Sequence, residues 1–135
     1  MGKFFSTRYN AGAFNTGILI LRLGAGILMA NHGYTKLIHY NEMKTQFMGF
    51  IGLSPSIALG LVIFAELLCA ILIALGLFTR LACIPLIIST TYALWKAHQW
   101  DVFGKGELVT LFLIVFVTLL FTGPGKVSVD NIISK

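Results

Sequence analysis

Charged side chains are scarce in this sequence. Asp, Glu, Lys and Arg make up 11% of its 135 residues, whereas 57% are hydrophobic and the mean hydropathy is +0.88. An average soluble domain carries about 25% charged residues, so the composition predicts an integral protein of the lipid bilayer. A membrane span needs about 20 residues, and a single domain over residues 1–135 has room for four of them.

Cysteine is almost absent, and so are the common cofactor motifs. Cys69 and Cys83 form no CxxC pair and no metal-ligand spacing, and both lie in apolar segments, so buried free thiols are the simpler interpretation. The sequence has no GxGxxG, P-loop, CxxCH or GxSxG pattern. Function classes that depend on these motifs have no support, and no intrinsic cofactor is expected.

Basic runs are missing too, although the net charge is +5. The ten Lys and Arg residues are scattered, with no aromatic-interleaved groove between them. This spacing argues against a nucleic-acid partner and favours contact with anionic lipid headgroups.

The apolar residues define an all-α fold, a polytopic membrane four-helix bundle. An even number of spans places both termini on one side of the membrane. Five basic residues on that side against four on the other favour a cytoplasmic location for the termini of this multi-pass protein. Arg22 interrupts the first apolar segment, which is therefore expected to be retained and not cleaved as a signal peptide. The helices are expected at about Phe14 to His32, Ser56 to Phe78, Leu81 to Ala97 and Glu107 to Thr122.

The connection between the first two helices, Gly33 to Pro55, is long for a hairpin. It mixes charged residues with the apolar run Phe47-Met48-Gly49-Phe50 and is expected to contain a short interfacial or re-entrant helix. Pro55 sets the start of the second helix, and Gly123-Pro124-Gly125 ends the fourth.

Glu66 is the most informative residue. It is preceded by 21 uncharged residues and followed by 13. A carboxylate at this depth is costly unless a partner or a wet cavity compensates it, so Glu66 is a candidate functional residue. A helical wheel places Arg22, His32 and Lys36 on one face with Gly26 and Gly33.

Depth estimates predict a pair between Arg22 and Glu66 inside the bundle. The pair could be a structural ion bridge without chemistry. Alternatively, it could bind a polar headgroup, a quinone carbonyl or a proton.

A second cluster is expected near the opposite boundary. It contains His32, Lys36, His98 and Glu107, which lie at or near helix ends. No HxxxH or ExxH spacing imposes metal geometry, so no metal site is predicted. A hydrogen-bonded polar lid, a proton-handling site or a ligand headgroup site is preferred, because imidazole titrates near neutrality.

Taken in order, these residues resemble the DoxX family of small bacterial and archaeal four-helix membrane proteins. The resemblance rests on Arg22-Leu23, Gly26, His32-Gly33, Lys36-Leu37, Glu66, Gly76-Leu77, Thr79-Arg80, Gly123-Pro124-Gly125, Ser128 and Asp130. It implies a location in the plasma membrane and a role beside membrane redox enzymes, since the family is named for a subunit of a thiosulfate:quinone oxidoreductase. It also marks Arg22, His32, Lys36, Glu66, Arg80 and Glu107 as the residues of interest.

The leading hypothesis is a subunit or accessory component of a membrane-associated, quinone-linked redox complex, not catalytic by itself. Its site would hold a quinone-like or other amphipathic ligand, with Glu66 or His32 exchanging a proton and Arg22 stabilising negative charge. A partner membrane protein or a homo-oligomer is expected. The alternatives are a non-catalytic scaffold or assembly factor and a small-molecule or ion carrier.

Overall fold

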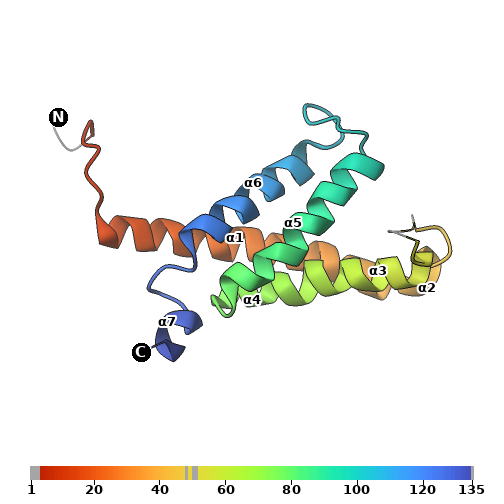
Figure 1. Ribbon diagram of the computed structural model, residues 1–135, viewed down its shortest axis with the longest axis horizontal. Helices are drawn as coiled ribbons and strands as arrows, with labels where there is room; N and C mark the ends of the chain where they lie inside the picture. Colours follow the sequence, from red (N-terminus) through yellow and green to blue (C-terminus); the bar gives the residue numbers. More distant parts are fainter. Residues whose placement is uncertain (1–3, 48, 50–51, 135) are drawn as a thin grey trace.

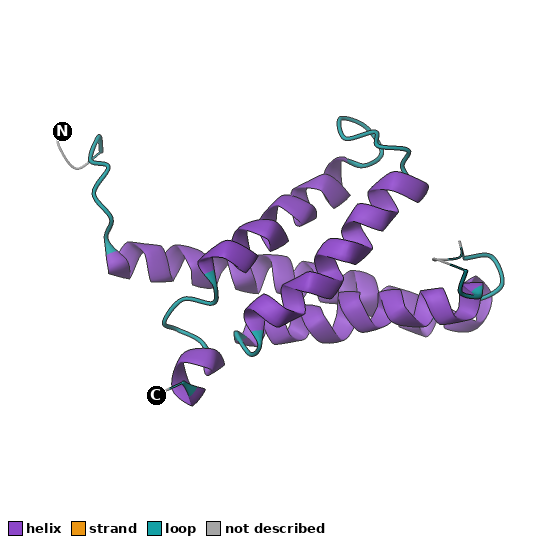
Figure 2. Ribbon diagram, viewed as in Figure 1, coloured by secondary structure: helices purple, strands orange, loops and turns teal. Residues whose placement is uncertain are grey.

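Helices account for all the regular structure in the residues that the computed structural model describes, which are 4–47, 49 and 52–134 (Figure 2). One long rod combines α3, the π-helix η1 and α4 without interruption over 21 residues. The elements are α1 (Ala11–Ile38), α2 (Tyr40–Met43), α3 (Pro55–Ile63), η1 (Phe64–Cys69), α4 (Ala70–Leu75), α5 (Thr79–Lys96), α6 (Glu107–Thr122) and α7 (Val129–Ile133).

Short polar residues and glycine set the ends of the two longest helical segments. The Asn10 side chain accepts a hydrogen bond from the Ala13 amide and caps α1. Ser54 caps α3 in the same way, and Pro55 stands at its first position, as expected from the sequence. The rod ends at Gly76, whose left-handed backbone (φ 76°) closes a Schellman turn.

Two glycines bring α1 against the rod. A Cβ on Gly33 would lie 2.5 Å from the Leu67 nitrogen, and one on Gly26 would lie 2.8 Å from the Ala70 oxygen. The two backbones are therefore in direct contact at both positions, as small residues allow in membrane helices. These contacts fix the antiparallel register of α1 and the rod, which run side by side in Figure 1.

A second hairpin, α5 and α6, lies obliquely across this pair (Figure 1). Its inner face contributes Leu86, Phe116 and Leu119, and the rod contributes Ile73; all four are fully buried. At the far end of the hairpin α5 leans away from α3, with which it makes at most marginal contact. The core is therefore concentrated where the hairpin crosses α1, η1 and α4.

Large apolar side chains also cover the outside of the helices. Ile20, Ile27, Leu81, Leu111 and Phe121 are all at least 60% exposed. So large an exposed apolar surface is typical of a protein surrounded by lipid. Helix α1 and the rod are long and apolar enough to cross a bilayer, and α6 is a shorter apolar helix of 16 residues.

The observed helices differ from the expected ones mainly at their ends. Helix α6 has the predicted bounds, whereas α1 continues six residues past His32 to Ile38. Gly33 is thus a packing residue inside the helix and does not begin the connection. The expected short helix in this connection is α2, while Met48, Phe50 and Ile51 lie outside the described residues.

The close approach at Gly33 yields a matched pair of variants. Gly33→Ala should lower the free energy of unfolding by about 1–3 kcal/mol, because the new methyl group must push two backbones apart. Gly24→Ala, in the same helix but with nothing within 4 Å, should instead stabilise it by about 0.5–1 kcal/mol. Reversible unfolding in mixed micelles measures both, and equal effects would contradict the packing described.

Candidate functional site

Arg22 is buried at the end of the rod, with 2% of its surface exposed. Its Nε donates to the Ile73 carbonyl at 3.1 Å and its Nη2 to the Ala74 carbonyl at 3.2 Å. Its Nη1 donates to the carbonyls of Pro124 and Val127, both at 2.6 Å. Every guanidinium nitrogen therefore bonds backbone oxygen, and we call these four acceptors the carbonyl cage.

The carbonyl cage joins the rod to the C-terminal segment. Ile73 and Ala74 lie in the last turn of α4, where carbonyls lack helical partners and the helix dipole is negative. Gly76 is required beside them, because its Cβ would meet the Arg22 Nη2 atom at 2.8 Å. Arg22 thus satisfies the end of one helix and fastens the chain that follows α6.

Asp130 completes this fastening. Its carboxylate accepts hydrogen bonds from the amides of Phe78 (2.7 Å) and Thr79 (3.0 Å), where α5 begins. The Asp130 amide donates to the Gly76 carbonyl at 2.8 Å. Nearby, Arg80 donates to the Phe121 carbonyl at the end of α6. These contacts hold helix ends together, and we call Arg22, Arg80 and Asp130 the structural cluster.

The predicted pair between Arg22 and Glu66 is wrong. Gly33 faces Glu66 across the helix contact, and Arg22 lies 11 residues before Gly33, about 16 Å along α1. The depth estimate assumed that the first helix begins at the same membrane boundary where the second helix ends. In fact the N-terminal part of α1 extends well past the end of α4 (Figure 1).

Glu66 pairs with Lys36 instead. The Lys36 Nζ lies 2.6 Å from both carboxylate oxygens of Glu66, which is only 7% exposed. Lys36 reaches it because α1 continues to Ile38, one turn beyond Gly33. Glu66 lies in η1, and π-helical turns occur often at functional sites.

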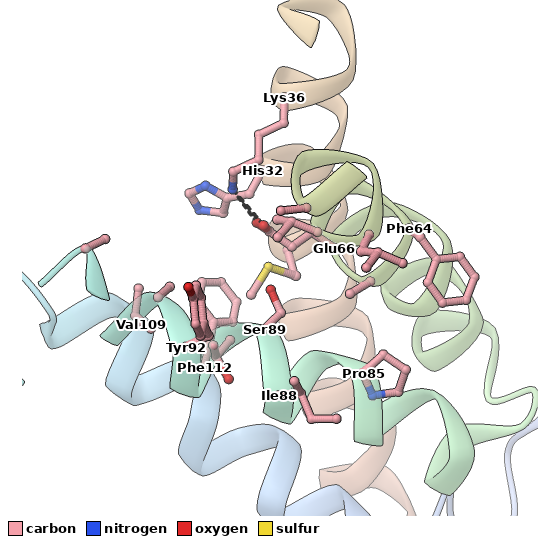
Figure 3. Close-up of a pocket in the computed structure, with 18 of the residues that line it drawn as sticks. His32, Lys36, Phe64, Glu66, Pro85, Ile88, Ser89, Tyr92, Val109 and Phe112 are labelled. Carbon is pink, nitrogen blue, oxygen red and sulfur yellow. Dashed lines mark hydrogen bonds and ion pairs between the residues drawn. The ribbon is translucent and has the colours of Figure 1, made fainter. Parts of the chain in front are cut away.

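A cavity of about 580 Å³ opens beside this ion pair, between α1 and η1 on one side and α5 and α6 on the other (Figure 3). Its walls are mainly apolar and include Ala65, Pro85, Ile88 and Phe112. The polar residues that line it are His32, Lys36, Glu66, Ser89, Thr90, Tyr92, His98 and Lys105. Such a concave, mostly apolar space with a few polar groups is typical of a small-molecule site.

The structure brings together most of the second predicted cluster. His32, Lys36 and His98 all line the cavity, and the His32 ring meets Phe112 edge-on at 5.8 Å. Glu107 does not line it; this residue is exposed in the first turn of α6, where the helix dipole favours a carboxylate. No three His, Cys, Asp or Glu side chains of the described residues are grouped to hold a metal ion.

Sequence reasoning missed the wall that α5 contributes. Ser89, Tyr92 and Ala93 lie on α5 and face the cavity, but their spacing resembles any helix face. Tyr92 donates a short hydrogen bond to the Gly49 carbonyl and so links α5 to the connection before α3. The pairing of Lys36 could have been found from its wheel position, had the first helix been extended.

Because Arg22 and Glu66 have different partners, substitutions at the two positions should affect the free energy of unfolding independently. In a double-mutant cycle, Lys36→Met and Glu66→Gln should show a coupling of about 1–3 kcal/mol, since the two side chains touch. Arg22→Lys and Glu66→Gln should be additive within about 0.5 kcal/mol. Unfolding in mixed micelles measures both cycles, and coupling only in the second would restore the pair predicted from sequence.

Comparison with known proteins gives the same family as the sequence motifs. A model of the DoxX family matches residues 17–99. The chain is 30% identical over 124 residues to the Bacillus subtilis protein named "Putative oxidoreductase CatD", with 91% of each chain covered. It is 29% identical over 124 residues to the Escherichia coli "Inner membrane protein YphA", in a match that covers 84% of this chain and 88% of the relative.

A third relative, an uncharacterized membrane protein of Mycobacterium tuberculosis, is 26% identical over 133 residues, with 87% of this chain and 82% of the relative covered. No solved structure matches the chain. The residues that carry the motif fall into the two clusters described above, with Arg22 and Asp130 in one and Lys36 and Glu66 in the other. The chain belongs to the DoxX family of membrane proteins.

Proposed function

We propose that the cavity beside Lys36 and Glu66 binds an amphipathic, quinone-like molecule, and that the protein is a membrane subunit or accessory component of a quinone-linked redox complex. The single observation that carries this proposal is the combination of a 580 Å³ apolar cavity with a buried, paired carboxylate on its wall. A buried carboxylate alone would be only structural. A carboxylate that faces a space large enough for a ring can also exchange a proton.

The cavity suits such a ligand in both size and chemistry. Volumes of about 300–1,000 Å³ accommodate ligands of this size. Phe112 and Pro85 offer flat surfaces, and Phe112 continues into a stack with Phe116. His32 and Lys36 stand on the same wall as Glu66, where they can donate hydrogen bonds to a carbonyl oxygen.

A bound quinone would supply the two-electron chemistry that no protein side chain here provides. The chain's own residues would orient it and handle its protons: Lys36 and His32 at the oxygen, and Glu66 as the proton-exchanging group. Arg22 has no part in this proposal, since its nitrogens already bond the carbonyl cage. The Bacillus subtilis relative is named an oxidoreductase, which also supports a redox role.

We further propose a multi-pass location in the plasma membrane, with the termini on the cytoplasmic side. The lengths of α1 and the rod support crossing of the bilayer. The ends of α1 and α3 near Lys36 would then lie at the opposite face, together with Lys105. Reporter fusions at the C-terminus and in the loop after α5 test this orientation.

A scaffold or assembly role is the second candidate, favoured by one observation. Gly17 and Gly24 lie two turns apart on α1, and a Cβ on either would meet nothing within 4 Å. These positions leave room for a helix of another protein to approach closely. Isolation in mild detergent separates the two roles: a dehydrogenase or oxidase partner supports the redox role, and a partner without redox activity contradicts it.

Filling the cavity tests the proposed ligand directly. Lipid extracted from the purified protein should contain quinone in near-stoichiometric amount. The variant Ala93→Trp, which places an indole in the cavity, should lower this amount at least about tenfold. The control Ile84→Trp changes a half-exposed residue of the same helix that does not line the cavity, and it should retain the quinone. Equal quinone content in all three proteins would contradict the proposal.

A further inference from the structure

The charges that line the cavity are not balanced. Glu66 is the only acidic residue among the described residues that line it, and both its carboxylate oxygens already bond Lys36. Among the described residues, neither the Lys105 Nζ nor the ring nitrogens of His32 and His98 make a hydrogen bond or ion pair. Basic groups without partners therefore remain on the cavity wall.

No carboxylate of the described residues forms an ion pair with these three groups. Asp101 accepts a hydrogen bond from the Lys105 amide, and Glu107 is exposed at the start of α6, but neither lines the cavity. His98 and Lys105 both lie in the loop that connects α5 to α6. Basic side chains without an ion-pair partner thus gather at the end of the cavity where α5 meets α6.

The other parts of the cavity are apolar and open sideways. Leu61, Phe64 and Ile88 line the cavity and are 47%, 47% and 51% exposed, so the cavity is not closed on this side. They lie on α3, η1 and α5, in the region where α5 leans away from α3 (Figure 1). A ligand can therefore extend from the cavity into the surrounding hydrocarbon between Phe64 and Ile88.

We infer that the cavity also binds a single-chain anionic lipid, of which a long-chain fatty acid is the simplest example. Its carboxylate lies at His98 and Lys105, and its chain runs past Phe64 and Ile88 toward the bilayer. The carboxylate would make charge-assisted hydrogen bonds, and the chain would bury apolar surface against the cavity wall. A space of about 580 Å³ lies in the size range of small-molecule sites and accommodates the headgroup and the adjoining part of one chain. This inference rests on the proposed function only in treating the cavity as a ligand site.

Photolabelling in phosphatidylcholine nanodiscs tests the inference. The probes are a long-chain fatty acid carrying a diazirine and its methyl ester, which has the same chain without the charge. The acid should label cavity residues of α3, η1 and α5 at least about fivefold more than the ester does. Lys105→Gln should reduce labelling by the acid to the level of the ester, and a His98→Gln variant should act in the same direction.

Lys126→Gln is the matched control, because it removes the same charge from an exposed residue outside the cavity. It should leave labelling unchanged. Equal labelling by acid and ester, or equal losses in the Lys105 and Lys126 variants, would overturn the inference. If quinone co-purifies while the acid fails to label, only the fatty-acid site is wrong. If the acid labels selectively and no quinone is found, the proposed function fails and this site stands.

Discussion

The contact between α1 and the rod at Gly26 and Gly33 determines the rest of the structure. Because two backbones touch there, the register between the helices has no freedom to slip by a turn. That register puts Arg22 level with the end of α4 and Lys36 within reach of Glu66. One steric constraint therefore decides which partner each buried charge receives, and it separates the structural cluster from the cavity.

The two buried charges illustrate different solutions to the same physical problem. Arg22 is compensated by four backbone carbonyls, so the charge joins a helix end to the C-terminal segment. Glu66 has one partner in the described part of the chain, Lys36, and borders an open space. A saturated guanidinium stabilises the fold, whereas a carboxylate beside a cavity can take part in proton exchange.

Much of the fold follows from local sequence, but the site depends on tertiary contacts. Helix α6 was predicted to the residue, because Gly123-Pro124-Gly125 ends a largely apolar run. The end of α1 was misplaced, since Gly33 in a sequence suggests a helix end and only the packed structure shows why it lacks a side chain. The cavity depends on how α5 leans across the rod, and no spacing of Ser89, Tyr92 and Ala93 encodes that angle. Lys36 was missed as the partner of Glu66 because the end of α1 was misplaced.

Lys36, and not Arg22, compensates the Glu66 carboxylate. Infrared difference spectroscopy on protein with labelled glutamate reports the state of Glu66 directly, with Glu66→Gln as the reference for assignment. The carboxylate band of Glu66 should shift in Lys36→Met, because its ion pair is lost, and should be unchanged in Arg22→Lys. A shift of this band only in the Arg22 variant would contradict the pairing of Glu66 with Lys36.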